Sequence, residues 1–334
     1  KKSLTERVES LSTIIFQEKL GTLADKTKRV IRLSELIATQ LGANIEWAKR
    51  AAFLAKADLM TDMVGEFGNL QGTMGRYYAV AENEPAEVAL AIEEHYYPKQ
   101  SGSGTPSSQT GRIVALADKL DTLTGIFSAG LIPTGDKDPY ALRRAALGSL
   151  RIIIENQLNL DIRALVDASV ALYLHQFQRE ETKQQVIDFI FDRLKSYSLD
   201  RGFAPDEFDA VIAVIPGQPF DFMMRLQAVK DFRQLPEASS LAAANKRIRN
   251  ILKKSDTLPK SQIGELIETE ERHLLEKAIS SAADIQPFLD KRDYQAALSR
   301  LAQTEPAVNA FFDKVMVMTD NLDLRAKRLA LLKL

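Results

Sequence analysis

The sequence predicts an all-α protein. Apolar residues recur at helical spacing along most of the chain, and helix-capping patterns precede several of these stretches. No segment shows a convincing alternation of apolar and polar residues, which would indicate a half-buried β-strand. We therefore expect a helical domain over residues 1–155, a helical connector over 156–235 and a second helical domain over 236–334.

The first domain is expected to open with a capping box, because Ser3 is followed three residues later by Glu6. Apolar residues of 23–41 then fall at helical spacing. Four glycines within 60–79 predict a less regular connector. The stretch 100–111, QSGSGTPSSQTG, is the most loop-like in the chain, and we expect a helix to follow it directly.

Asp138 followed by Pro139 is typical of a helix start, with the aspartate as N-cap and the proline in the first helical position. Several amphipathic helices are expected between 156 and 235, and a final helical block from 236 to the end. The core of the last domain is expected to contain Phe311, Phe312, Val315 and Met316.

Composition restricts the possible functions. The chain has 334 residues, of which 45% are hydrophobic, so it can bury a sizeable core. Its net charge is −1, so any nucleic-acid contact must come from a local basic patch. The absence of cysteine excludes disulfides, thiolate zinc sites and cysteine nucleophiles, and it fits a reducing cytoplasm, where we expect the protein to be located. Apolar runs are too short to span a membrane, and no membrane contact is expected.

Residues 115–125, ALADKLDTLTG, place Asp118 and Asp121 three residues apart in a predicted helix. Together with the preceding EEHYYPKQSGSGTP, this segment resembles the HD phosphohydrolase superfamily, in particular its branch with a Gly-Tyr-Pro motif. Such enzymes use a histidine, an adjacent His-Asp pair and a distant aspartate to hold two metal ions that activate water. The resemblance would make Asp118 the distant aspartate and would assign a ligand role to the neighbourhood of His95.

The other ligands are missing. Lys26 or a neighbour stands where the first histidine is expected, and AAFLAKADL offers Lys56 and Asp58 in place of a His-Asp pair. Because an ammonium group opposes cation binding, we expect no metal and no catalytic residue in this chain. Asp118 and Asp121 are instead expected to cap, to pair with Lys56 or Arg112, or to hold the helix in register. The alternative is a residual metal phosphohydrolase within residues 1–155.

Longer strings identify a second resemblance. LAKADLMTDMVGEFGNLQGTMGRYYA, ADKLDTLTGIFSAGLIPTGDKDPYALRRAALGSLRIIIE, LAAANKRIRNILKKS and AFFDKVMVMTDNLDLRAKRLALL are similar to the β subunit of bacterial heterotetrameric glycyl–tRNA synthetase, and they cover nearly the whole chain. The chain begins with Lys1 rather than Met and ends in RLALLKL, so we expect a fragment that corresponds to the C-terminal half of that subunit.

The resemblance implies a degenerate HD-type domain, a helical connector and an anticodon-binding bundle of the kind called DALR. It also implies an α2β2 assembly in which glycine and ATP, with Mg, are activated on a separate α subunit. The chain itself would be non-catalytic and would hold no cofactor. Its expected partners are tRNA(Gly), the α subunit and the rest of the β chain.

The residues alone also indicate a nucleic-acid role for 241–255, which contains five basic residues and no acidic one. At about 100° per residue the polar side chains share one helical face, and Leu241, Ala244, Ile248, Ile251 and Leu252 share the opposite face. A basic face suits phosphate contacts, although such a face can also be simply solvated. The candidate RNA contacts on this helix are Lys246, Arg247, Arg249, Asn250 and Lys253, with Lys254 flanking them.

Two further clusters are candidates. Arg143 and Arg144 follow the expected helix start and suit an acceptor-stem phosphate, but they could equally bridge to Asp136, Asp138 or a neighbouring helix. On the last helix Arg325 and Arg328 are candidate RNA contacts. There we expect at least one of the basic residues 325, 327 and 328 to pair with Asp320 or Asp323. A third possible function is an assembly scaffold that holds the α subunit and binds no RNA.

Overall fold

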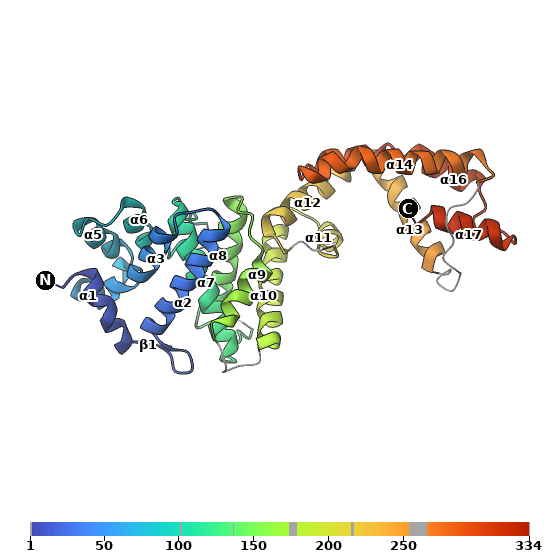
Figure 1. The fold of residues 1–334 in the computed structure, drawn as a ribbon. Helices are drawn as coiled ribbons and strands as arrows, with labels where there is room; N and C mark the ends of the chain where they lie inside the picture. Colours follow the sequence, from blue (N-terminus) through green and yellow to red (C-terminus); the bar gives the residue numbers. More distant parts are fainter. Residues whose placement is uncertain are drawn as a thin grey trace. The chain divides into compact units, whose positions relative to one another are not determined.

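The computed structural model describes residues 2–100, 102–135, 137–173, 179–214, 217–253 and 266–333. Two compact units divide the chain (Figure 1): unit 1 comprises Lys1–Phe208 and Val214–Phe222, and unit 2 comprises Asp209–Ala213 and Met223–Leu334. Within the described ranges nearly all regular structure is helical, which confirms the predicted fold class. None of the described helices combines the length and the low polarity that crossing a bilayer requires.

Unit 1 begins with α1 (Leu4–Glu9), where Ser3 and Glu6 form the predicted capping box. A short hairpin of β1 (Ile15–Gln17) and β2 (Gly21–Thr22) follows; strands this short leave no alternating pattern, which is why the sequence did not predict them. The remaining helices within this unit are α2 (Leu23–Gln40), α3 (Ile45–Leu54), α4 (Asp62–Glu66), α5 (Thr73–Ala81), α6 (Ala86–Glu94), α7 (Gln109–Ser128), α8 (Leu142–Glu155), α9 (Ile162–Ala171) and α10 (Arg179–Leu199). Short 3-10 helices occupy Ser10–Thr13, Ala57–Met60 and Gly68–Leu70.

Helix α7 is the centre of unit 1. It contacts α2, α3, α6, α8, α9 and α10, and its side chains from Ile113 to Ala117 are fully buried. Its start is fixed by the loop before it: Ser108 caps the helix by accepting a hydrogen bond from the Gly111 N–H, and the Glu94 carboxylate accepts N–H groups from Ser107 and Ser108. The contacts of Ser107 and Ser108 with Glu94 therefore orient the helix that carries Asp118 and Asp121.

The helix that Asp138 was predicted to cap begins later than expected. Helix α8 starts at Leu142, and Ala141, with φ of +54°, precedes it. Asp138 still stabilises this end, because its two carboxylate oxygens accept the backbone N–H groups of Leu142 at 2.8 Å and Arg143 at 2.9 Å. The prediction that Asp138 caps this helix is thus confirmed, but the predicted start of the helix at Pro139 is wrong.

Helices α11 (Pro205–Ile212) and α12 (Pro219–Phe232) belong partly to each unit. Unit 2 also contains α13 (Ala238–Lys253), α14 (Thr269–Asp290), α15 (Tyr294–Ala302), α16 (Glu305–Lys314) and α17 (Leu322–Leu331). Helix α14 contacts α15, α16 and α17, and α13 contacts α16. Figure 1 shows α14 with α16 beside its end. The hydrophobic core of unit 2 includes Phe311 and Val315, and Phe311 is fully buried.

The segment after α16 corrects the predicted core. Phe311 and Val315 are buried and Phe312 is partly buried, as expected, but 73% of Met316 is exposed. The chain leaves the helix at Val315 in an extended conformation, so consecutive side chains face opposite sides. Val315 and Val317 therefore pack into unit 2, while Met316 and Met318 face solvent.

Candidate functional site

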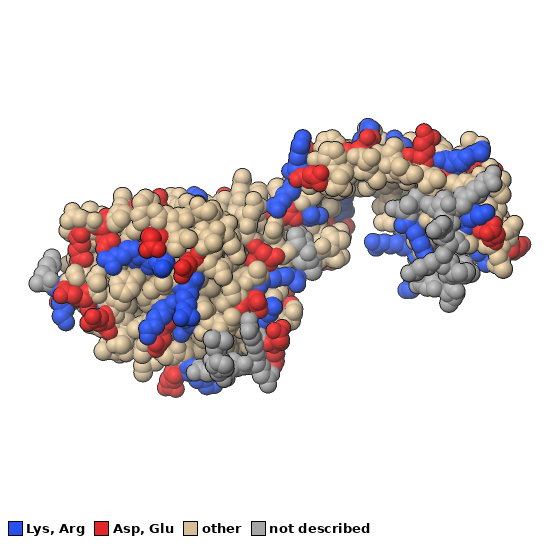
Figure 2. All heavy atoms as spheres, viewed as in Figure 1, with Lys and Arg blue, Asp and Glu red and all other residues tan. Residues whose placement is uncertain are grey.

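The predicted basic face of α13 is present on the surface of unit 2. Its five candidate side chains are all exposed: Lys246, Arg247, Arg249, Asn250 and Lys253. The opposite face packs inward, because Ala244 is buried and Ile248, Ile251 and Leu252 contact the hydrophobic core. Figure 2 shows Lys and Arg side chains gathered over this helix. The predicted flanking residue Lys254 lies outside the described residues.

A groove of about 570 Å³ runs beside this face. One wall is α13, through residues that include Lys246, Arg247 and Asn250, and the other is the segment 315–318 with Met316 and Met318. The Arg247 guanidinium stacks on the Phe312 ring at 4.3 Å from its centroid. Cationic and amide groups thus line one side of the groove, and adaptable apolar thioethers line the other.

The two candidate RNA contacts on α17, Arg325 and Arg328, differ in burial. Arg325 donates from Nε to the Thr319 carbonyl at 2.8 Å, and the expected ion pair on this helix forms between Lys327 and Asp323 at 2.8 Å. Arg328, by contrast, is only 5% exposed and forms a buried ion pair with Glu271 of α14. A guanidinium held inside unit 2 cannot contact RNA, so we remove Arg328 from the candidate contacts.

Arg143 and Arg144 lie at the start of α8 in unit 1. Arg143 donates to the Gly135 carbonyl, and Arg144 donates to the Lys99 carbonyl at 3.3 Å. Asp138 is occupied by backbone N–H groups, and Asp136 lies outside the described residues. The two arginines border a groove of about 610 Å³, which is also lined by Arg151, Arg193 and Arg201.

The sequence did not predict this arginine groove, because α8 and α10 bring its walls together. Helical spacing from Arg144 to Arg151 was the one local signal available. Not every guanidinium in the groove is available to a ligand. Arg151 pairs with Glu155 at 2.7 Å, and Arg201 stacks on Tyr197 at 3.5 Å from the ring centroid.

Asp118 is surrounded by ammonium groups rather than by metal ligands. The same oxygen, Oδ1, lies 3.3 Å from Lys26 Nζ and 3.5 Å from Lys56 Nζ, so the predicted pairing with Lys56 is confirmed. Arg112 instead donates to the carbonyls of Pro106 and Ser107. Across the described ranges, no three His, Cys, Asp or Glu side chains are grouped as a metal site would require.

Asp121 has a purely internal environment. Its fully buried carboxylate accepts hydrogen bonds from Lys26 at 3.1 Å, from Arg29 at 2.7 Å and from the Tyr173 hydroxyl at 2.8 Å. The Arg29 guanidinium also lies over the Tyr173 ring, 4.3 Å from its centroid. Asp121 therefore joins α7 to α2 and to the end of α9, which is a structural role.

The protonation states in this cluster follow from burial and charge. Burial alone would raise the pKa of Asp118, but Lys26 and Lys56 outweigh burial and hold the pKa well below its ordinary value. Burial lowers the pKa of Lys119 to about 8, although Asp118 opposes that shift. Burial, helped by Lys56, also lowers the pKa of His95 well below its ordinary value, so this imidazole is neutral. Its Nδ1 lies 2.7 Å from the Ile92 carbonyl.

Asp58 also forms only internal contacts of unit 1, through hydrogen bonds to backbone N–H groups. The residue is fully buried, and its Oδ2 accepts the N–H groups of Gly72 at 2.6 Å and Gly75 at 3.1 Å. Burial raises its pKa, and these two donors oppose the rise. Asp58 therefore anchors the start of α5.

Unit 2 is a helical domain in which the basic face of α13 lies beside a groove with one cationic and one apolar side. Comparison with protein families assigns the class of this domain. Residues 241–334 match the family model described as "DALR anticodon binding domain", and residues 1–213 match the one described as "Glycyl-tRNA synthetase beta subunit". The second match covers more than half of the chain. The chain belongs to the glycyl-tRNA synthetase beta subunit family.

Curated relatives agree with this assignment. Over 326 residues, which are 97% of this chain and 48% of the relative, the chain is 48% identical to a glycine–tRNA ligase beta subunit of Pseudomonas aeruginosa (strain UCBPP-PA14). It is 45% identical over 335 residues to the beta subunits of Shigella boydii serotype 4 and Escherichia coli K12 (DH10B), covering 100% of this chain and 49% of each relative. The chain spans about half the length of the curated relatives it matches.

Proposed function

We propose that this chain is the tRNA-recognition part of a glycine–tRNA ligase β subunit and binds tRNA(Gly) through the basic face of α13. The observation that carries the proposal is the groove of unit 2, where exposed cations face exposed methionines within a domain that matches an anticodon-binding family. Lys246, Arg249 and Lys253 are assigned to phosphate contacts. Arg247 and Asn250 are assigned to the edges of unstacked bases, and Met316 and Met318 to their faces.

The rest of the assembly is part of the same proposal. Glycine and ATP, with Mg, would be activated on a separate α subunit in an α2β2 enzyme located in the cytoplasm. The present chain would contribute RNA contacts and no catalytic residue. Arg143 and Arg144 are assigned to a second tRNA contact, at the acceptor stem, and Arg325 to the edge of the anticodon site. The names of the relatives and the chemistry of the two basic grooves support these assignments.

Mobility shift of the 334-residue chain with tRNA(Gly) and with a non-cognate tRNA tests the proposal. We expect tighter binding of tRNA(Gly) and a steep salt dependence. Equal, undetectable binding of both RNAs at low salt would refute it for this chain. A pull-down of the α subunit without tRNA then separates the alternative of a scaffold, since a scaffold would retain α while binding neither RNA.

A charge-reversal pair tests the assigned helix. Lys246→Glu with Arg249→Glu should weaken binding and lower the slope of log K against log salt by about 0.7 for each lost single-strand phosphate contact, roughly 1.4 in total. The matched control is Arg272→Glu with Lys291→Glu, which makes the same change of charge at exposed positions at the start of α14 and directly after its end. An equal loss of slope in both double variants would remove α13 from the interface.

A further inference from the structure

The sulfur atoms of this chain all belong to methionine, because the sequence contains seven methionines and no cysteine. A peroxide that meets the protein therefore finds thioethers rather than thiols as its sulfur targets. All seven methionines lie within the described ranges, and three of them are exposed. Met316 is 73% exposed, whereas Met318 and Met63 are 44% and 41% exposed. By exposure, Met316 is the first thioether that a peroxide in solution reaches.

The backbone that carries Met316 is held in place by buried groups. The Arg328 guanidinium, itself paired with Glu271, donates a hydrogen bond to the Met316 carbonyl at 2.8 Å. Val315 and Val317, on either side of Met316 in the sequence, are buried and pack into the hydrophobic core of unit 2. The Met316 side chain is therefore presented to solvent from a fixed backbone, and a chemical change at its sulfur atom does not require the fold to change.

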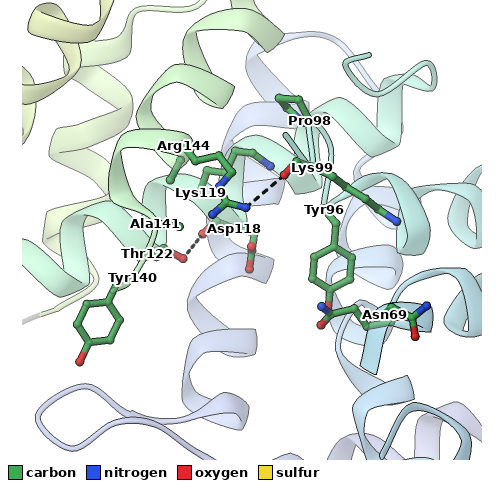
Figure 3. Close-up of a pocket in the computed structure, with 12 residues that line it drawn as sticks. Asn69, Tyr96, Pro98, Lys99, Asp118, Lys119, Thr122, Tyr140, Ala141 and Arg144 are labelled. Atoms are coloured by element: carbon green, nitrogen blue, oxygen red, sulfur yellow. Dashed lines mark hydrogen bonds between the residues drawn. The ribbon is translucent and has the colours of Figure 1, made fainter. Parts of the chain in front are cut away.

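The exposed methionines of unit 2 also form the apolar side of the groove beside α13. Met316 and Met318 line this groove together with Lys246 and Arg247 of the opposite wall. Neither the arginine groove nor the cavity beside Asp118, which Figure 3 shows, has a methionine among its described lining residues. Oxidation of exposed methionine therefore changes the lining of the α13 groove and leaves the lining of the other two unaltered.

We propose that Met316 is an oxidative modification site, where a hydroperoxide converts the thioether to a sulfoxide, and that Met318 follows on the same wall of the groove. With hydrogen peroxide, a lone pair of the sulfur atom attacks one peroxide oxygen, the O–O bond breaks and an S–O bond forms. The proton on the transferred oxygen passes to the displaced hydroxide, which leaves as water. Sulfur loses the two electrons that the peroxide gains. Enzymes that reduce methionine sulfoxide reverse the change.

The sulfoxide changes what the groove accepts. A thioether is apolar and polarizable, whereas a sulfoxide is polar and carries an oxygen that accepts hydrogen bonds. On the methionine wall this oxygen lies across the groove from Lys246 and Arg247 and offers these donors an acceptor in place of an RNA oxygen. We therefore expect oxidation to weaken RNA binding several-fold, a consequence that rests on the proposed function of the groove.

Limited oxidation with hydrogen peroxide, followed by peptide mass spectrometry, tests the modification site in the 334-residue chain without RNA. We expect Met316 to gain an oxygen atom first. The half-buried methionines should react last: Met60, Met74, Met223 and Met224. Met63 is the matched comparison, because it is exposed but lies on α4 of unit 1. Oxidation of Met63, or of any half-buried methionine, as fast as Met316 would overturn the assignment.

Mobility shift with tRNA(Gly), before and after peroxide, measures the consequence for binding. The test variant is Met316→Leu with Met318→Leu, and the matched control is Met63→Leu, because leucine has a similar volume and no sulfur atom. Peroxide should lower the affinity of the parent and of Met63→Leu several-fold, and treatment with methionine sulfoxide reductases should restore both. The double variant should keep whatever affinity it had before peroxide. An equal loss in the double variant would show that the sensitivity lies elsewhere and refute the proposed effect.

Two controls separate this effect from damage to the fold and from failure of the proposed function. Far-UV circular dichroism should be unchanged by peroxide, and a loss of helical signal that accompanies the loss of binding would refute an effect confined to the groove. Bound tRNA(Gly) should slow oxidation at Met316 but not at Met63, and equal rates with and without RNA would place Met316 outside the RNA interface. If the untreated chain binds no RNA, the anticodon-site proposal fails, whereas the order of methionine oxidation still decides the modification site.

Discussion

Replacing Lys119 by methionine should stabilise unit 1 at neutral pH. Lys119 is 8% exposed on α7, and its ammonium donates a hydrogen bond to the His95 carbonyl at 3.2 Å. Its aliphatic part passes close to Gly148 of α8, where even a Cβ atom would lie 2.9 Å from Lys119 Cε. Methionine keeps most of this unbranched stem and removes the buried charge.

The magnitude follows from the pKa of Lys119, which burial lowers from 10.5 to about 8. The unfolded chain binds this proton more tightly than the folded one, so the charged lysine costs about 3 kcal/mol of stability at any pH below the folded value. The cost declines as pH rises from about 8 towards 10.5, because the folded protein then releases the proton. Subtracting about 1 kcal/mol for the lost hydrogen bond leaves a net gain of about 2 kcal/mol at pH 7.

Urea unfolding measures this effect through the fluorescence of Trp47, which is the only tryptophan and lies on α3 of unit 1. Relative to Lys119→Met, the parent chain should gain about 2–3 kcal/mol between pH 7 and pH 10. Lys28→Met provides the exposed control and should follow the parent at every pH. Parallel pH profiles for parent and Lys119→Met, or a variant that is less stable at pH 7, would refute this account of the buried amine.

Three further changes test the buried contacts. Asp121→Ala should cost unit 1 about 3–5 kcal/mol in the same urea assay, because it leaves buried cations unpaired; a loss below about 1 kcal/mol would contradict the structural role. Arg328→Met should lower the hydrogen-exchange protection of α14 and α17 by a similar amount, since Glu271 loses its partner, without changing the salt slope of tRNA binding. A changed slope would return Arg328 to the RNA contacts. Gly125→Ala should cost about 1–3 kcal/mol in urea unfolding, because its Cβ would lie 2.3 Å from the Tyr173 hydroxyl, and an unchanged midpoint would show that Tyr173 moves freely.

Helix α13 was predictable because its properties are local. Its basic and apolar faces follow from residue spacing within one helix, and the structure places both faces as expected. The capping box at Ser3 and the loop before α7 were predictable for the same reason. In each case the residues that decide the conformation are within a few positions of one another, so no knowledge of tertiary contacts was needed.

Properties that depend on distant segments were not predictable in this way. Arg328 resembles its neighbour Arg325 in sequence, but Arg328 is buried because Glu271, on another helix, faces it. Met316 was expected in the core, but the chain leaves α16 at Val315 in an extended conformation, and Met316 faces solvent while Val315 and Val317 are buried. The arginine groove requires α8 and α10 to lie side by side, which neither helix specifies alone.

The Asp118 cluster depends both on local sequence and on contacts with distant segments. The helix ALADKLDTLTG alone indicates a metal ligand, and only the residues that meet it decide otherwise. Two ammonium groups lie within 3.5 Å of one Asp118 oxygen. A divalent ion about 4 Å from each would be repelled by about 8 kcal/mol per ammonium at an effective dielectric constant of 20, or about 16 kcal/mol in total. A single carboxylate at the ligand distance of about 2 Å would attract it by about the same amount. The single carboxylate therefore leaves no net attraction for a divalent cation at Asp118. Lysine at the expected ligand positions therefore neutralises the carboxylate on which a metal site would depend.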